Sequence, residues 1–239
     1  MIVIRPHCRL HFTAADVDFI LKAVGRSPQD CTALRELLTD DESRDLLLDR
    51  PELYRAVLET TGCLTISPHL YFYVLVRHAL QDAGVPNREV ADYVAELLAA
   101  FTRTEQTRAR LPGESRSLDY FVEMLEGMQR ADDRNAFALR AHMGNQALYY
   151  SGLFNERIDH RSRQRGFPGI AYYEGLGEAS FAAASHDRWA ARLGLSELFA
   201  LLSHCFHRAR LALNSMSDRL VSLGDGGHHL DRLLITPAP

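Results

Sequence analysis

A run of seven apolar residues at positions 70–76, LYFYVLV, limits the possible folds of this 239-residue chain more than any other feature. The Ser67-Pro68 pair before it can open a helix, because proline is tolerated in the first helical turn, and Gly84 can end that helix. A helix over residues 69–83 is apolar on every side, and such a helix has to be buried. The run is much shorter than the roughly 20 apolar residues of a membrane span. Other helices of this chain, or of a partner, therefore have to surround it.

Most of the remaining chain repeats its apolar residues at intervals of three and four, which is the spacing of an amphipathic helix. Thr13 and Asp16 can cap the first of these helices. Alternating strand patterns are confined to short stretches at 2–4 and 64–66. We therefore expect an all-α multi-helix bundle with two or three fully buried central helices, at residues 69–82, 136–154 and 170–184.

The chain has no linker rich in proline, glycine or serine. We expect one helical domain over residues 1–239, in which residues 1–62 form short flanking helices and residues 67–223 form the main bundle. Residues 155–169 carry four arginines between two of the expected helices, and their pattern predicts a long basic connection.

Composition and charge argue against several classes of protein. The net charge of -4 is small and negative, which argues against non-specific nucleic-acid binding. The cysteines are far apart and form no CxxC pair, so neither a redox motif nor a zinc knuckle is indicated. Arg5, His7 and Arg9 interrupt the apolar N-terminus, which therefore does not resemble a signal peptide. We expect a cytoplasmic protein without a membrane segment.

Polar side chains occur on the helices that are expected to be buried, where an unpaired charge is costly. Glu174 and Glu178 lie one turn apart on one helical face, and His142 can change its charge near neutral pH. These three residues are the predicted acid, base and proton-transfer groups of a buried polar pocket that binds a small molecule. The predicted ligand-binding residues of that pocket are His78, Arg140, Asn145, Tyr149 and Tyr173.

Three other interpretations stay open at this point. The polar groups can be ion pairs that only fix the register of buried helices. The protein can be a non-enzymatic interaction or regulatory protein, possibly a homodimer, that docks through its N-terminal helices or its basic connection. It can also be a carboxylate/histidine metalloprotein. Because the Glu-x-x-His spacing of di-iron helices does not occur, we predict no metal ligands, and the sequence names no cofactor.

Two segments resemble each other and a wider group of proteins. Residues 144–154, GNQALYYSGLF, and residues 172–181, YYEGLGEASF, resemble segments of uncharacterised helical bacterial proteins. That resemblance implies no activity. Within both segments a glycine follows paired tyrosines, which predicts that Gly152 and Gly175 let two helices approach closely while the tyrosines fill the space beside them.

Overall fold

The computed structural model describes residues 3–60, 66–113 and 116–223, and all of the regular elements in these ranges are helices. The N-terminal part comprises η1 (Cys8–His11), α1 (Ala14–Val24), α2 (Pro28–Leu37), α3 (Asp41–Leu48) and α4 (Pro51–Glu59). The middle comprises α5 (Pro68–Asp82), α6 (Arg88–Phe101), α7 (Thr104–Thr107), α8 (Phe121–Arg130) and α9 (Asp133–Leu153). The last part comprises α10 (Asn155–Arg165), α11 (Ile170–Ser185), α12 (Arg188–Leu193) and α13 (Ser196–Leu223). The all-α prediction is confirmed for the described residues.

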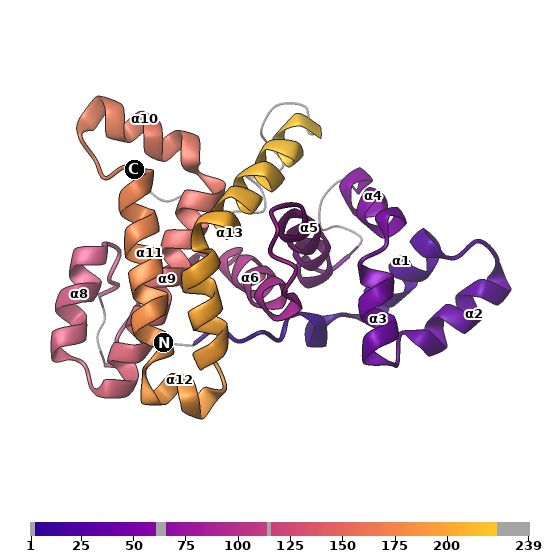
Figure 1. Cartoon of the computed structure of the whole chain (residues 1–239), viewed down its shortest axis with the longest axis horizontal. Helices are drawn as coiled ribbons and strands as arrows, with labels where there is room; N and C mark the ends of the chain where they lie inside the picture. Colours follow the sequence, from indigo (N-terminus) through magenta and orange to yellow (C-terminus); the bar gives the residue numbers. More distant parts are fainter. Residues whose placement is uncertain (1–2, 61–65, 114–115, 224–239) are drawn as a thin grey trace.

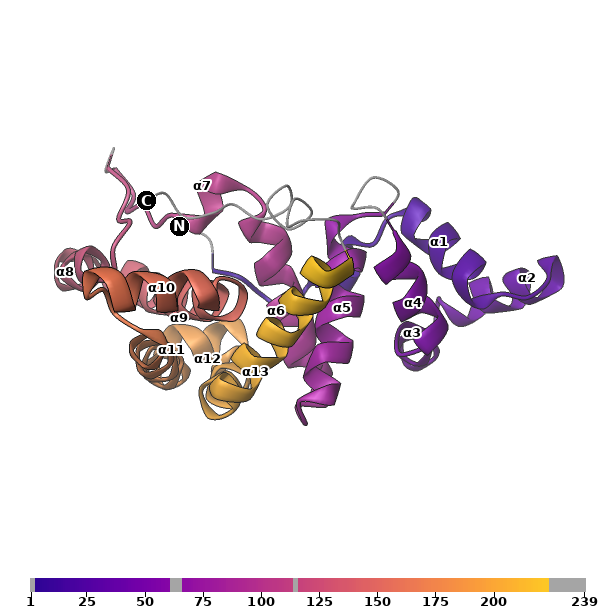
Figure 2. The ribbon, with the colours of Figure 1, turned by 90° about the horizontal axis from the view of Figure 1, so that it is seen from above.

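Helices α5 and α6 lie in the middle of an elongated molecule. Helices α1–α4 lie on one side of this pair and α8–α12 lie on the other (Figures 1 and 2). The long helix α13 joins the central pair to the second side, since it contacts α5 as well as α9 and α11. None of the helices in the described ranges is long and apolar enough to span a membrane.

Burial differs among the three helices that were expected to be buried. In α5, residues 70–77 and 79–80 are buried, and in α9 residues 137–139 and 141–149 are buried. In α11 only five residues are buried, so the predicted burial of residues 170–184 is wrong. One side of α11 faces solvent with alanine and glycine, whose small apolar area costs little to expose.

The residues expected to form a long basic connection are mostly helical. Residues 155–165 form α10, and Gly166 ends it in the left-handed conformation, with φ 66°. The connection was predicted because this stretch lacks an apolar stripe. Ile158 is its one buried residue, so α10 is a solvent-exposed helix.

Glycines set the spacing between α9, α11 and α13. A Cβ atom on Gly152 would lie 2.8 Å from the Leu213 side chain, and one on Gly177 would lie 2.2 Å from the Phe206 ring. A Cβ atom on Gly175 would meet nothing within 4 Å. The predicted close approach is therefore present at Gly152 and wrong at Gly175, and Gly177 has the role expected of its neighbour.

Candidate metal centre

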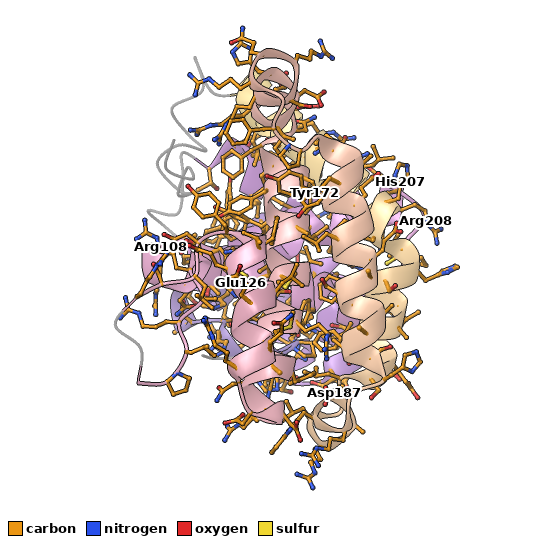
Figure 3. The ribbon with its side chains drawn as sticks, turned by 90° about the vertical axis from the view of Figure 1, so that its left-hand side faces the viewer. Arg108, Glu126, Tyr172, Asp187, His207 and Arg208 are labelled. Carbon is orange, nitrogen blue, oxygen red and sulfur yellow. The ribbon has the colours of Figure 1, made fainter. Side chains whose placement is uncertain are left out.

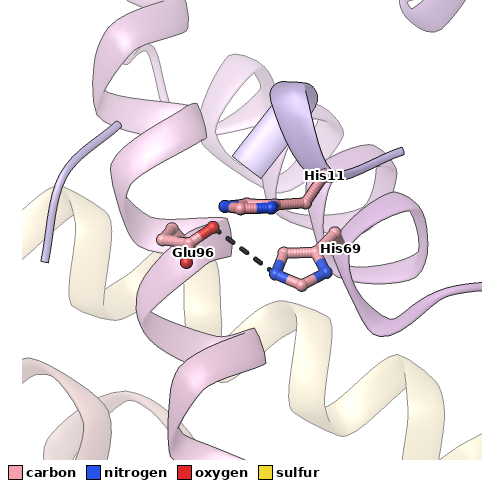
Figure 4. Close-up of side chains that lie close together, drawn as sticks. All are labelled: His11, His69 and Glu96. Atoms are coloured by element: carbon pink, nitrogen blue, oxygen red, sulfur yellow. Dashed lines mark ion pairs between the residues drawn. The ribbon is translucent and has the colours of Figure 1, made fainter. Parts of the chain in front are cut away.

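Three elements from distant parts of the sequence bring His11, His69 and Glu96 together (Figure 4). His11 ends η1, His69 lies in the first turn of α5 and Glu96 lies in the middle of α6. Each residue offers one ligand atom, and these atoms all lie within 4.8 Å of one another. Nε2 of His69 lies 3.6 Å from Oε2 of Glu96, and the two imidazole centroids are 4.8 Å apart.

Arg9 positions the His11 side of the cluster. The Arg9 backbone N–H donates to Oδ1 of Asp92 at 3.0 Å, and its Nε donates to the same oxygen at 3.1 Å. Asp92 lies on α6 one turn before Glu96. The two bonds therefore hold η1 against the helix that supplies the carboxylate.

The start of α5 positions His69. Ser67 caps this helix, because its side chain accepts a hydrogen bond from the Leu70 N–H. The Ser67 N–H donates in turn to Oδ1 of Asp16 at 2.7 Å. The Cys8 thiol donates to the backbone oxygen of His69 at 3.3 Å. Ser67 and His69, at the start of α5, are thus both hydrogen-bonded to the N-terminal segment.

The electrostatics of the cluster favour a cation. Oε2 of Glu96 is buried without a hydrogen-bond partner, and burial raises the pKa of this carboxyl. Burial is the main cause that lowers the pKa of His69, which keeps its imidazole neutral near pH 7. A neutral imidazole and an unpartnered carboxylate both have lone pairs available for a metal ion.

The donor set fits a borderline transition-metal ion. Imidazole nitrogen and carboxylate oxygen are ligands of Zn²⁺ and its neighbours, whereas Mg²⁺ and Ca²⁺ prefer all-oxygen sites. Metal–ligand bonds of roughly 2.0–2.2 Å place tetrahedral ligand atoms about 3.4 Å apart. The side chains therefore have to close by about 1 Å around an ion, which rotation of the exposed His11 side chain can supply.

The predicted ligand residue Asn145 lies elsewhere, in the core between α6 and α9. Its Oδ1 accepts a hydrogen bond of 2.7 Å from the Tyr93 hydroxyl, and both side chains are buried. Two other buried residues of α9, His142 and Gln146, form hydrogen bonds with the backbone oxygen of Thr107, at 3.3 Å and 2.5 Å. These contacts satisfy buried polar groups and fasten α7 to α9.

The predicted tyrosines belong to an aromatic cluster. The Tyr149 ring is fully buried and lies 5.0 Å from the Phe101 ring and 5.6 Å from the Phe154 ring, between centroids. The Tyr173 ring lies 5.6 Å from the Phe121 ring of α8. Their positions indicate a role in packing α9 and α11 against their neighbours.

The two predicted catalytic carboxylates have different surroundings. Oε1 of Glu174 accepts hydrogen bonds from Arg210 at 2.5 Å and from the exposed His207 at 2.7 Å. Burial alone would raise the pKa of Glu174, but these two partners lower it below its usual value. Glu178 has no side-chain partner among the described residues, although its backbone oxygen accepts from Ser203 at 3.0 Å. Figure 3 shows His207 on α13 beside α11.

The last two residues of the predicted set are Arg140 and His78. They contact different helices. Arg140 pairs at 3.5 Å with Asp187, the N-cap of α12. A surface hollow at this point is lined by Asp133, Ala136, Arg140, Asp187 and Arg188. The His78 ring of α5 stacks on Tyr54 of α4, with 4.3 Å between centroids. The structure thus distributes the eight predicted residues over several places and pairs most of them.

Sequence reasoning missed the cluster because its members come from three elements with no common local spacing. His69 was visible as a polar residue in the first turn of an apolar helix. Glu96 was visible as a carboxylate among the apolar residues of the next helix. His11 gave no signal, since it lies in the short helix η1 outside any amphipathic pattern.

Comparisons with protein-family models, curated protein sequences and solved structures found no significant match. The resemblance of residues 144–154 and 172–181 to uncharacterised helical bacterial proteins therefore stays a prediction. Any functional argument depends on the geometry of this chain.

Proposed function

We propose that this protein binds one divalent transition-metal ion of the Zn²⁺ class through His11, His69 and Glu96. The observation that supports the proposal most strongly is the buried Oε2 of Glu96, which has no hydrogen bond and lies beside two imidazoles, 3.6 Å from Nε2 of His69. A buried polar atom without a partner is costly, and proteins retain such costs mainly at functional sites. A bound cation offsets this cost and uses the neutral imidazole of His69 at the same time.

The proposed site has room for a further ligand. Three protein ligands leave at least one coordination position of a tetrahedral ion for water or a small molecule, which is the arrangement of catalytic zinc sites. His11 is exposed, so solvent and small molecules reach at least this side of the cluster. The small molecule that the sequence analysis expected is then a ligand of the metal ion, and a metal-bound water is a source of hydroxide near neutral pH.

The pocket of Glu174, Glu178 and His142 remains a second proposal with less support. Glu174 is neutralised by Arg210, and His142 is engaged with Thr107. Its test is the Glu178→Gln variant, which should abolish small-molecule binding without loss of stability.

A homodimer also remains a proposal. The observation in its favour is that α8, α11 and the residues just before them carry exposed large apolar side chains, namely Tyr120, Val122, Leu125, Phe167 and Tyr172. Analytical ultracentrifugation of the full chain tests it, because a homodimer sediments with twice the monomer mass of 27.0 kDa.

The metal proposal is tested by titrating tag-free, chelator-treated protein with ZnCl₂ in a calorimeter and with CoCl₂ in a spectrophotometer. We expect one ion per chain and Co²⁺ absorption bands typical of a site with nitrogen and oxygen ligands. Glu96→Gln should weaken binding by at least about 100-fold, because it removes a direct ligand. Glu89→Gln is the matched control, since Glu89 is exposed on the same helix. Equal affinity of the two variants, or no binding to the parent chain, would overturn the proposal.

A further inference from the structure

The N-terminal helices meet the rest of the described molecule through a few pairs of elements, and their buried apolar residues join the same core as α5 and α6. Their main contacts across this boundary are η1 with α5, η1 with α6 and α4 with α5. Helix α1 reaches across it through the hydrogen bond between Asp16 and the Ser67 N–H, and its main contacts are with α2, α3 and α4, inside the N-terminal part. Figure 1 shows α1–α3 projecting away from the central helices. Whatever holds η1 and α4 in place therefore holds this whole group of helices.

Charged side chains already bridge the boundary. Nη1 of Arg9 binds Oδ1 of Asp45 on α3 at 2.5 Å, and its Nε binds Asp92 of α6. Asp49, the C-cap of α3, accepts from Arg77 of α5 at 2.8 Å and from Arg88 of α6 at 2.7 Å. Because Arg77 and Asp92 are buried, loss of either pair would leave an interior charge without its partner, so both pairs favour the docked arrangement.

The candidate metal ligands lie across the same boundary. His11 belongs to the N-terminal side, whereas His69 and Glu96 belong to the central helices. When η1 moves away together with the N-terminal helices, His11 leaves and only two ligands remain. An ion therefore binds the docked arrangement more tightly than the undocked one, and by linkage it stabilises docking to the same extent.

We propose that metal binding at His11, His69 and Glu96 fastens helices α1–α4 to α5 and α6, so that metal occupancy controls how often the N-terminal helices undock. This inference rests on the proposed metal site. It makes the site a metal-dependent clasp in addition to a place where a further ligand can bind. A metal-free chain exposes the boundary faces of α4, α5 and α6 more often than a metal-bound chain.

Hydrogen exchange of the full chain, measured by mass spectrometry with and without ZnCl₂, tests the clasp. At a free Zn²⁺ concentration of 100 times Kd, amides of α1–α4 should exchange at least about tenfold more slowly, with an upper limit of about 100-fold. Amides of α8, whose main contacts are with α9 and which does not adjoin the N-terminal helices, are the internal control and should change little. Glu96→Gln should remove the Zn²⁺ effect and leave the metal-free exchange pattern in place.

A second measurement uses the converse effect: if Zn²⁺ binding favours docking of the N-terminal helices, weaker docking has to lower the affinity for Zn²⁺. Asp45→Asn weakens the Arg9 bond without touching any metal ligand. It should speed the exchange of α1–α4 and raise the Kd for Zn²⁺ once the undocked state is substantially populated. Asp18→Asn is the matched control, because Asp18 pairs only with the exposed Arg35 within the N-terminal group.

The outcomes separate the clasp from the metal site itself. Stoichiometric Zn²⁺ binding with unchanged exchange in α1–α4 overturns the clasp and leaves the metal site standing. The absence of Zn²⁺ binding overturns both proposals. Slower exchange throughout the chain, α8 included, shows a general stabilisation and also overturns the clasp.

Discussion

Oε2 of Glu96 lies 3.6 Å from Nε2 of His69, and it is buried without a hydrogen bond. Because burial raises the pKa of Glu96, the folded protein holds this proton more tightly than the unfolded chain does. Ionisation of Glu96 therefore lowers the stability of the metal-free fold as the pH rises through its folded-state pKa. A carboxylate that destabilises its own fold is expected at a binding site.

The Glu96→Gln variant should separate stability from binding. In EDTA at pH 8, its free energy of unfolding should exceed that of the parent by on the order of 1 kcal/mol, because a neutral amide is less costly to bury. In ZnCl₂ the order should reverse, because only the parent gains metal-binding energy. Urea denaturation under both conditions measures this, with Glu89→Gln as the control. A less stable Glu96→Gln protein in EDTA would show that the carboxylate has a structural role.

Two glycines on α11 should respond differently to the same substitution. Gly177→Ala places its Cβ 2.2 Å from the buried Phe206 ring, and we expect a loss of about 1–3 kcal/mol from overpacking. Gly175→Ala meets nothing within 4 Å and should stabilise the helix by roughly 0.5–1 kcal/mol. Thermal and urea denaturation compare the two variants directly. Equal effects would mean that α11 does not contact α13 at Gly177.

The helices and their caps could be predicted because both depend on neighbouring residues. Thr13 and Asp16 form the capping box at the start of α1, as their spacing predicted. The apolar run at 70–76 lies in the buried part of α5. Local spacing fails at α11, because alanine and glycine count as apolar in a pattern but are tolerated at the surface.

The site could not be predicted because it depends on which distant residues meet. Arg140 pairs with Asp187 and Glu174 pairs with Arg210, and neither partner was considered from the sequence. Arg140 and Glu174 are therefore engaged in two separate ion pairs, on different parts of the molecule. The His11 and Glu96 pairing requires the N-terminal segment to cross the start of α5, which no helical periodicity encodes.

Glu174 and Glu178 provide a test of this distinction, since both were predicted to be catalytic. Glu174→Gln removes the charge that Arg210 and His207 bind, and it should cost about 2 kcal/mol at pH 7. Because the pKa of Glu174 is lowered in the folded state, this contribution is present above the unfolded pKa and is lost as the pH falls through the folded one. Glu178→Gln should change stability by less than about 0.5 kcal/mol, because its side chain has no partner among the described residues. A cost of similar size for both variants in urea denaturation would contradict the assignment.

His142 should make the fold sensitive to mild acid. Burial lowers its pKa from 6.5 to about 4, although the hydrogen bond to the Thr107 oxygen acts in the opposite direction. The unfolded chain therefore binds this proton between pH 6.5 and about pH 4, whereas the folded protein does not. In that window stability falls as the pH falls, by roughly 3 kcal/mol in total at about 1.4 kcal/mol per pKa unit.

The His142→Gln variant isolates this contribution. A glutamine amide can still donate to the Thr107 oxygen, but it does not titrate. The difference in free energy of unfolding between parent and variant, measured in urea at pH 7 and again at pH 4.5, should shift in favour of the variant as the pH falls. Carboxylates titrate in both proteins, so their contributions cancel in the difference. A difference that does not change with pH would mean that water reaches His142, and that the Thr107 segment does not seal this face of α9.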